Sequence, residues 1–209
     1  MFELLQSGGA VMVVIFLFSL VGMAAFFERL FALRRGRVAP EAVTVEVKEL
    51  VTQGRIPDAL TLCRKQPGPL TRVVEVILMQ PDKSRAELKE LAEEVGRRES
   101  ADLERFTGVV GIVASVAPLL GLLGTVWGMI QTFDVIQTQG MGQIGLLAGG
   151  ISTALVTTFG GLSVGIPALI AHRYLLSLVD DLTLELEEAA LSILDLVTSH
   201  AGEGAQESE

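Results

Sequence analysis

The sequence predicts an all-α membrane protein in which three transmembrane helices carry long cytoplasmic helical extensions. The composition is 50% hydrophobic, the mean hydropathy is +0.52, and the apolar residues are concentrated in runs. Residues 8–27 carry no charge, and Asp134 is the only charge between Phe106 and Ala171. A helix needs about 20 residues to cross the hydrocarbon core. The first run therefore predicts one span, and the second predicts two spans joined near Asp134.

These runs and the helix-breaking residues give the expected organisation of the chain. The segments are a periplasmic N-terminus at 1–7, the first span at 8–27, a cytoplasmic helical insertion at 28–84, a long helix at 85–133 that includes the second span at about 106–133, a periplasmic loop at 134–144, the third span at 145–172, a cytoplasmic C-terminal helix at 173–199 and a disordered tail at 200–209. Within the insertion, Gly54 is placed to end a helix, and Ser84 with Glu87 forms a capping box. No proline lies between this box and Pro118, so the long helix is expected to enter the second span unbroken.

The basic residues predict how the chain is oriented in the membrane. Every Lys and Arg except Arg173 lies between Arg29 and Arg105. The positive-inside rule therefore places the insertion and the C-terminus in the cytoplasm, and the N-terminus and the Asp134 loop in the periplasm. No basic residue precedes the first span, so that span is expected to be an uncleaved anchor rather than a signal peptide. The net charge of −9 gives no support to nucleic-acid binding.

Small residues recur at four-residue spacing in the second and third spans. Such spacing lets transmembrane backbones approach closely, so that van der Waals packing holds the helices together. The residues expected to pack in this way are Gly121, Gly124, Gly128, Gly145, Gly149, Gly161 and Gly165. A four-residue row also drifts around the helix by about 40° per step. One row can therefore face a neighbouring helix at one end and a central cavity at the other.

Threonines interrupt the apolar spans at similar positions. Thr153 and Thr157 lie in the glycine row of the third span, and Thr125 lies four residues after Gly121 in the second. A lone threonine can bond its own helix, but hydroxyls that share a face can also hold water or a carboxyl group. The three are expected to line a narrow proton path. Hydroxyls cannot store a proton near neutral pH, and no Asp, Glu, Lys or Arg lies within a predicted span. If the protein moves protons, the titrating carboxylate must therefore come from another chain. Pro118 and Pro167 interrupt the same spans, as simple kinks or as hinges of the path.

The sequence contains no constellation that indicates an enzyme. His172 and His200 have no carboxylate or cysteine at metal-ligand spacing, and Cys63 is the only cysteine. The glycine-rich stretches are apolar spans and not phosphate-binding loops. We therefore expect no catalytic residues, no metal and no cofactor.

APLLGLLGTVWGMIQTF at 117–133 and GGISTALVTTFGGLSVGIPALI at 149–170 resemble the MotA/TolQ/ExbB proton channel family, in particular its ExbB/TolQ branch. The resemblance implies a multi-pass protein of the bacterial inner membrane that forms a pentameric ring around a small single-span ExbD/TolR-like partner, whose transmembrane Asp carries the proton. It implies that Thr125 and Thr157 correspond to pore threonines of the family, and that Pro118 and Pro167 act in coupling. Well-known ExbB and TolQ members carry a glutamate where this chain has Thr153, which leaves the partner's Asp as the only proton carrier.

Three functions are compatible with these features to different degrees. The favoured one is the ring subunit of a proton-driven motor that powers outer-membrane transport, envelope maintenance or gliding. The alternative is a passive helical membrane scaffold that does not conduct ions and whose hydroxyls only pack helices. A secondary transporter is disfavoured, because three spans without an inverted repeat leave little room for a substrate site.

Overall fold

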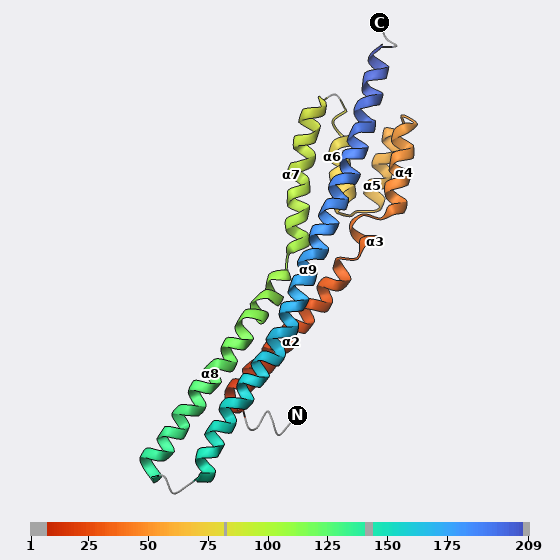
Figure 1. Cartoon of the computed structure of the whole chain (residues 1–209). Coiled ribbons are helices and arrows are strands. Elements are labelled where there is room, and N and C mark those ends of the chain that lie inside the picture. Colours follow the sequence, from red (N-terminus) through yellow and green to blue (C-terminus); the bar gives the residue numbers. More distant parts are fainter. Residues whose placement is uncertain (1–7, 82, 141–143, 207–209) are drawn as a thin grey trace. The chain divides into compact units, whose positions relative to one another are not determined.

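The computed structural model describes residues 8–81, 83–140 and 144–206, and every regular element within these ranges is a helix (Figure 1). The elements are α2 (Gly9–Ala32), α3 (Arg35–Val38), α4 (Glu41–Thr52), α5 (Ile56–Lys65), α6 (Pro69–Leu78), α7 (Arg85–Glu104), α8 (Thr107–Gln139) and α9 (Ile144–Gln206). Three stretches are long and apolar enough to cross a membrane: Gly9–Ala32, Thr107–Thr138 and Leu147–Ser199. The all-helical class and the three spans agree with the sequence prediction.

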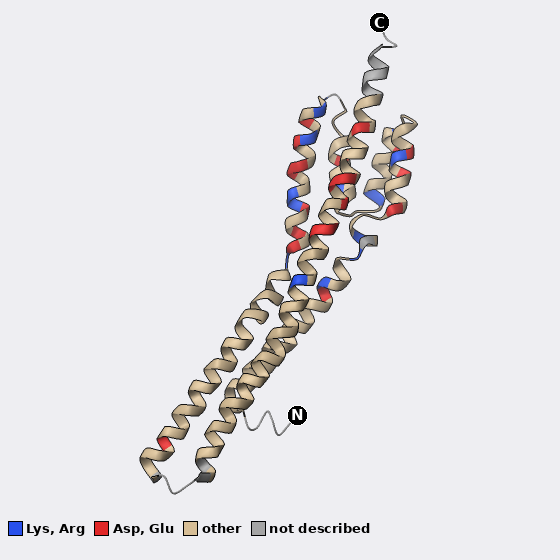
Figure 2. Ribbon diagram, in the orientation of Figure 1, with Lys and Arg blue, Asp and Glu red and all other residues tan. Residues whose placement is uncertain are grey.

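The helices are distributed over two compact units. The membrane unit contains residues up to Arg29 and Phe106–Leu175, and the charged unit contains Leu30–Arg105 and the chain from Leu176 onward. Figure 2 shows that the Asp, Glu, Lys and Arg residues are concentrated on α4–α7 and on the second part of α9. In contrast, α2, α8 and the first part of α9 are almost uncharged along their described lengths.

The charged unit has its own hydrophobic core, built from one face each of α4 to α7 and of the second part of α9. Val51, Ala59, Ile77, Leu88 and Ile193 are completely buried there. The helix ends follow the predicted local signals. Gly54 has a φ of +72°, and its N–H donates to the Val51 carbonyl at 2.9 Å, which closes α4.

The predicted capping box at the start of α7 is confirmed. The Ser84 hydroxyl accepts a bond from the Glu87 N–H at 3.4 Å, and the Ser84 N–H donates to the Glu87 carboxylate at 3.0 Å. Hydrogen bonds from the Ser84 side chain and backbone lower the pKa of the exposed Glu87 carboxyl below its usual value.

The prediction of one unbroken helix from residue 85 into the second span is wrong. Helix α7 ends at Glu104, and α8 begins at Thr107. Between them Arg105 is extended, and Phe106 has a φ of 66°, in the left-handed region that non-glycine residues rarely adopt. The Phe106 ring lies 5.5 Å from the guanidinium carbon of Arg29, which is a cation–π contact. Tertiary contact, rather than a glycine or proline, therefore accompanies the break.

Several other boundaries also differ from the expected segments. Helix α2 continues beyond residue 27 to Ala32. Helix α8 continues beyond residue 133 to Gln139, so residues 134–139 of the expected loop at 134–144 are helical. Helix α9 continues to Gln206, within the segment expected to be a disordered tail. The expected N-terminal segment 1–7, residues 141–143 of the loop and residues 207–209 of the tail lie outside the described residues.

Candidate functional site

The membrane unit is built around an antiparallel contact between α8 and the first part of α9. Small residues recur every three or four positions along both helices, and those of α8 lie against those of α9. On α8 they are Ala114, Ala117, Gly121, Gly124 and Gly128, and on α9 they are Gly150, Ala154, Thr157, Gly161 and Gly165. A Cβ added at Gly161 would lie 2.6 Å from the Ala117 carbonyl oxygen, and one added at Gly128 would lie 2.5 Å from that of Gly150. The two backbones therefore approach too closely for a larger side chain at these points.

Five of the seven glycines predicted to pack closely lie in this contact: Gly121, Gly124, Gly128, Gly161 and Gly165. Gly145 and Gly149 do not, because a Cβ added at either position would have no atom within 4 Å. These two lie on the same four-residue row as Gly161 and Gly165, which turns away from α8 as it drifts around α9. Gly150 also lies in this contact and was not among the predicted glycines, although its spacing of four residues before Ala154 is a signal that could have identified it.

Thr157 is fully buried inside the α8–α9 contact. Its exposed fraction is 0%, and its side chain fills the notch that Gly124 leaves on α8. Its hydroxyl lies 3.0 Å from the Thr153 carbonyl oxygen and 2.9 Å from that of Ala154, so it is satisfied by its own helix. In this chain Thr157 therefore acts first as a packing residue.

Thr125 and Thr153 lie at the margin of this contact and are partly exposed. The Thr125 hydroxyl donates to the Leu122 carbonyl at 2.6 Å, and the Thr153 hydroxyl donates to the Gly149 carbonyl at 3.1 Å. A hydroxyl that donates in this way can still accept a hydrogen bond from another group. The three predicted threonines thus do not share one open face, and these two are the ones that a second chain could reach.

The two prolines occupy different surroundings. Pro118 packs against Gly165, where an added Cβ would lie 2.5 Å from the proline Cγ, so the glycine accommodates the proline ring. Pro167 lines an apolar cavity of about 450 Å³ in the membrane unit, bounded by α2, α8 and α9. Helix α2 joins this group through Gly22, which lies against Val113 of α8. Pro118 is therefore fixed by the α8–α9 contact, and Pro167 lies at the wall of the apolar cavity.

Ionisable groups are few in the described part of the membrane unit. They are Glu28, Arg29, Asp134, His172, Arg173 and Tyr174. Asp134 is exposed and borders a hollow of about 370 Å³ with Gln131, Gly145 and Gly149. No Asp or Glu lies between Thr107 and Phe133, or between Leu147 and Ala171.

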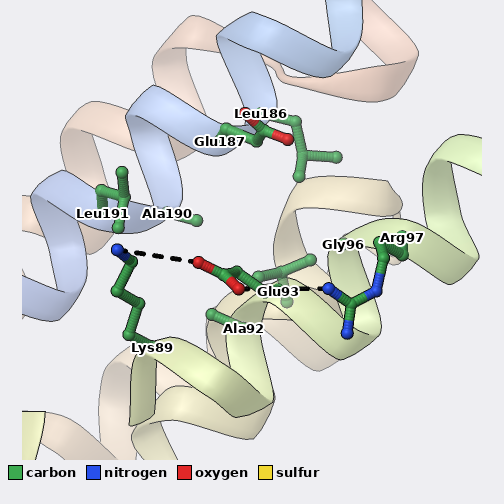
Figure 3. Close-up of a pocket in the computed structure, with 10 residues that line it drawn as sticks. Lys89, Ala92, Glu93, Gly96, Arg97, Leu186, Glu187, Ala190 and Leu191 are labelled. Atoms are coloured by element: carbon green, nitrogen blue, oxygen red, sulfur yellow. Dashed lines mark ion pairs between the residues drawn. The ribbon is translucent and has the colours of Figure 1, made fainter. Parts of the chain in front are cut away.

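The charged unit has a different kind of hollow, shown in Figure 3, between α7 and α9. Its volume is about 330 Å³; Leu186 and Ala190 line it, and Glu93 forms ion pairs with Lys89 at 3.7 Å and with Arg97 at 4.0 Å. Exposed pairs of this kind contribute little to stability. The more consequential pair in this unit joins Arg72 to the buried Glu99 carboxylate at 2.6 Å. This hydrogen bond to Glu99 raises the pKa of Arg72.

Similarity to known proteins extends over both the site and the surrounding helices. A model of the MotA/TolQ/ExbB proton channel family matches residues 66–188, which include all of α7, α8 and the predicted site. A biopolymer transport protein ExbB homolog of Methanothermobacter thermautotrophicus is 28% identical over 180 residues, or 86% of this chain and 64% of that protein. The chain thus spans slightly less than two thirds of the length of that relative.

Two further relatives belong to bacteria. The biopolymer transport protein ExbB of Neisseria meningitidis serogroup B is 30% identical over 188 residues, which cover 81% of this chain and 84% of that protein. The Tol-Pal system protein TolQ of Haemophilus influenzae is 38% identical over 78 residues, or 37% of this chain and 34% of that protein. The chain is therefore a membrane protein of the MotA/TolQ/ExbB proton channel family, on its ExbB/TolQ branch.

Proposed function

We propose that the chain is the ring subunit of an inner-membrane motor driven by the proton motive force. Membership of a proton channel family supports this function, as do relatives named for biopolymer transport and for the Tol-Pal system. The subunits assemble as a homopentamer around a small single-span ExbD/TolR-like partner that has a transmembrane Asp. The load is outer-membrane transport, envelope maintenance or gliding.

The charge distribution supports one orientation for this subunit. All Lys and Arg residues except Arg29 and Arg173 belong to the charged unit, and these two lie close to the ends of the membrane unit's segments. The charged unit and the C-terminus are therefore cytoplasmic, and the N-terminus and the α8–α9 connection are periplasmic. In this orientation α2, α8 and the first part of α9 cross a bacterial inner membrane.

The observation that carries the proposal is that accessible hydroxyls lie in two apolar stretches, Thr107–Phe133 of α8 and Leu147–Ala171 of α9, that contain no Asp or Glu. A carboxyl group in an apolar environment favours its neutral form, because burial raises its pKa. The hydroxyls of Thr125 and Thr153, at the margin of the α8–α9 contact, can accept a hydrogen bond from a neutral carboxylic acid and donate one to a carboxylate. Thr157 supports this path by holding α9 against Gly124.

The energy available per proton limits how such a motor can work. One charge that moves through 100 mV supplies about 2.3 kcal/mol. Appreciable mechanical work therefore needs several protons in each step. Pro118, packed on Gly165, and Pro167, beside the apolar cavity, are placed to transmit a helix movement to the rest of the membrane unit.

Proton flux through reconstituted complexes tests this proposal. The full chain is co-purified with a single-span partner that carries a transmembrane Asp, placed in liposomes, and given a proton gradient while a pH-sensitive dye reports the lumen. A hydrogen bond to a charged group is worth about 1.5–3 kcal/mol. The double variant Thr125→Val/Thr153→Val should therefore reduce flux by at least about tenfold, since 1.4 kcal/mol corresponds to a factor of ten.

Ser115→Ala is the matched control. Ser115 is also exposed on α8 and donates to the Gly111 carbonyl at 3.0 Å, so its loss removes a hydroxyl bonded to its own helix in the same way. This control should keep the flux of the unmodified complex. If the unmodified complex conducts no protons, the chain is a passive helical scaffold. If it conducts and the double variant conducts equally, Thr125 and Thr153 do not line the path.

A further inference from the structure

His172 lies on α9 where its apolar stretch ends, directly before Arg173. Although the residue is partly exposed, its Nδ1 atom is buried and has no hydrogen-bond partner. Within the described part of the chain, it is the only buried side-chain nitrogen or oxygen in this condition. Most buried polar atoms in proteins are hydrogen-bonded, and an unsatisfied one costs about 1–3 kcal/mol. This nitrogen therefore calls for a functional explanation.

The packing around the ring shows why it is held in place. A Cβ added at Gly111 of α8 would lie 2.9 Å from both Cε1 and Nε2 of the imidazole. The ring therefore lies edge-on against the α8 backbone, in a notch that exists only because residue 111 has no side chain. With Nε2 facing α8, the buried Nδ1 remains available as an acceptor.

The charged groups around this position are few. Helix α9 itself contributes Arg173 and the Tyr174 hydroxyl, both on exposed side chains, and α8 contributes no ionisable residue from Thr107 to Phe133. Helix α2 packs on α8 through Gly22 and Val113, and its charged groups are Glu28 and Arg29, which form an ion pair at 2.7 Å. None of these groups donates a hydrogen bond to the buried Nδ1 atom.

We propose that His172 is a proton-exchange group of this subunit, which binds the transported proton at Nδ1 where the path meets the cytoplasm. The inference rests on the proposed function and orientation. Imidazole is the side chain whose charge changes most readily near neutral pH. It can therefore do what the threonines of the path cannot, which is to hold a proton between the partner's carboxyl group and the cytoplasm.

The proton binds and leaves at the same atom, Nδ1. The neutral ring, with its hydrogen on Nε2, takes a proton at Nδ1 from a hydronium ion, which leaves water. The imidazolium then breaks the same N–H bond when a cytoplasmic water accepts the proton, and the original tautomer returns. Because Nδ1 is buried, the exchange needs a movement of α9, and Pro167 lies five residues earlier, where a helical hydrogen bond is lost.

Imidazole NMR of the full chain tests the proton-binding atom directly. The chain has two histidines, so a His200→Gln variant labelled with ¹⁵N-histidine reports on His172 alone. The complex with its single-span partner is placed in lipid vesicles, and the pH is changed on the cytoplasmic face or on the other face. We expect the Nδ1 signal to change from an acceptor to a protonated nitrogen in response to the cytoplasmic face only. A signal that ignores the cytoplasmic pH would overturn the proposal.

Proton flux through the same vesicles supplies the functional readout. His172→Asn keeps a hydrogen-bonding side chain of similar shape but cannot bind a proton, and His172→Gln serves if the first variant does not assemble. Flux should fall by about 100-fold, the lower end of what a positioned acid–base group contributes, and should lose its dependence on cytoplasmic pH. His200→Gln should conduct like the unmodified complex. If that complex conducts and His172→Asn keeps its rate and pH profile, the inference fails alone; if it does not conduct, the proposed motor function fails with it.

Discussion

Replacing Gly161 by alanine should force α8 and α9 apart, whereas the same replacement at Gly149 should be tolerated. Both glycines lie on the same four-residue row of α9 and within its apolar stretch, so they form a matched pair. A Cβ at Gly161 would lie 2.6 Å from the Ala117 carbonyl oxygen and 2.9 Å from the Gly121 Cα. A Cβ at Gly149 would meet nothing within 4 Å.

The size of the effect follows from the distance at Gly161. A carbon normally approaches a carbonyl oxygen to about 3.3 Å, so the helices must separate by about 0.7 Å. A gap of this size forfeits about a quarter to a half of each nearby dispersion contact. Overpacking of this kind costs about 1–3 kcal/mol. The gain in helix propensity from glycine to alanine applies equally at both positions and cancels in the comparison.

Reversible unfolding of the purified full-length protein in mixed micelles measures this difference. The free energy of unfolding should fall by about 1–3 kcal/mol for Gly161→Ala, and should stay within about 0.5 kcal/mol of the unmodified chain for Gly149→Ala. Equal values for the two variants would refute the assigned register of α8 and α9. A loss confined to Gly149→Ala would show that the other face of α9 forms the tighter contact.

Three further predictions concern single side chains. Thr157→Val should fold normally because valine keeps the shape that fills the Gly124 notch. Thr157→Ser should lose about 1 kcal/mol of unfolding free energy. A serine variant more stable than the valine variant would contradict a packing role. Arg72→Met should lower the free energy of unfolding by about 2 kcal/mol, which is less than for a fully buried pair because Arg72 is half-exposed. The double variant Arg72→Met/Glu99→Met should recover most of this loss. Thermal unfolding measures both variants, and an undiminished loss in the double variant would count against the prediction. Burial raises the pKa of the Cys63 thiol to about 11. Alkylation of Cys63 in the folded chain should therefore be about 100-fold slower than in urea, and it should accelerate as the pH rises. Equal alkylation rates in both conditions would show that Cys63 is accessible.

Local signals in the sequence were sufficient for much of the fold. Charge-free runs predicted the three spans, Gly54 predicted the end of α4, and the Ser84–Glu87 box predicted the start of α7. The charge-free runs are continuous in the sequence, and the Gly54 and Ser84–Glu87 signals act within about one turn of helix, so no distant contact is needed to interpret them. The break at Phe106 has no such signal, because it involves a contact with Arg29, far away in the sequence.

The candidate site was only partly predictable for a related reason. The four-residue row from Gly145 to Gly165 is correct as a pattern, but a helix contact follows alternating steps of three and four residues. The contact on α9 accordingly runs through Gly150, Ala154, Thr157, Gly161 and Gly165, and the row belongs to it only from Thr157 onward. Sequence spacing alone could not show that Thr157 is buried while Thr153 is partly exposed. His172 was noted only as a histidine without metal-ligand spacing, because its burial against Gly111 depends on the α8–α9 register.

The proposed subunit forms a ring in which Thr125 of α8 and Thr153 of α9 meet a carboxyl group carried by another chain. The most direct measurement is the structure of the purified complex, with its subunit stoichiometry determined by native mass spectrometry. We expect a pentamer with a single-span helix on its axis and a transmembrane Asp of that helix beside Thr125 and Thr153. A ring whose axis holds only lipid, or an axial helix whose carboxyl group lies away from both threonines, would contradict it.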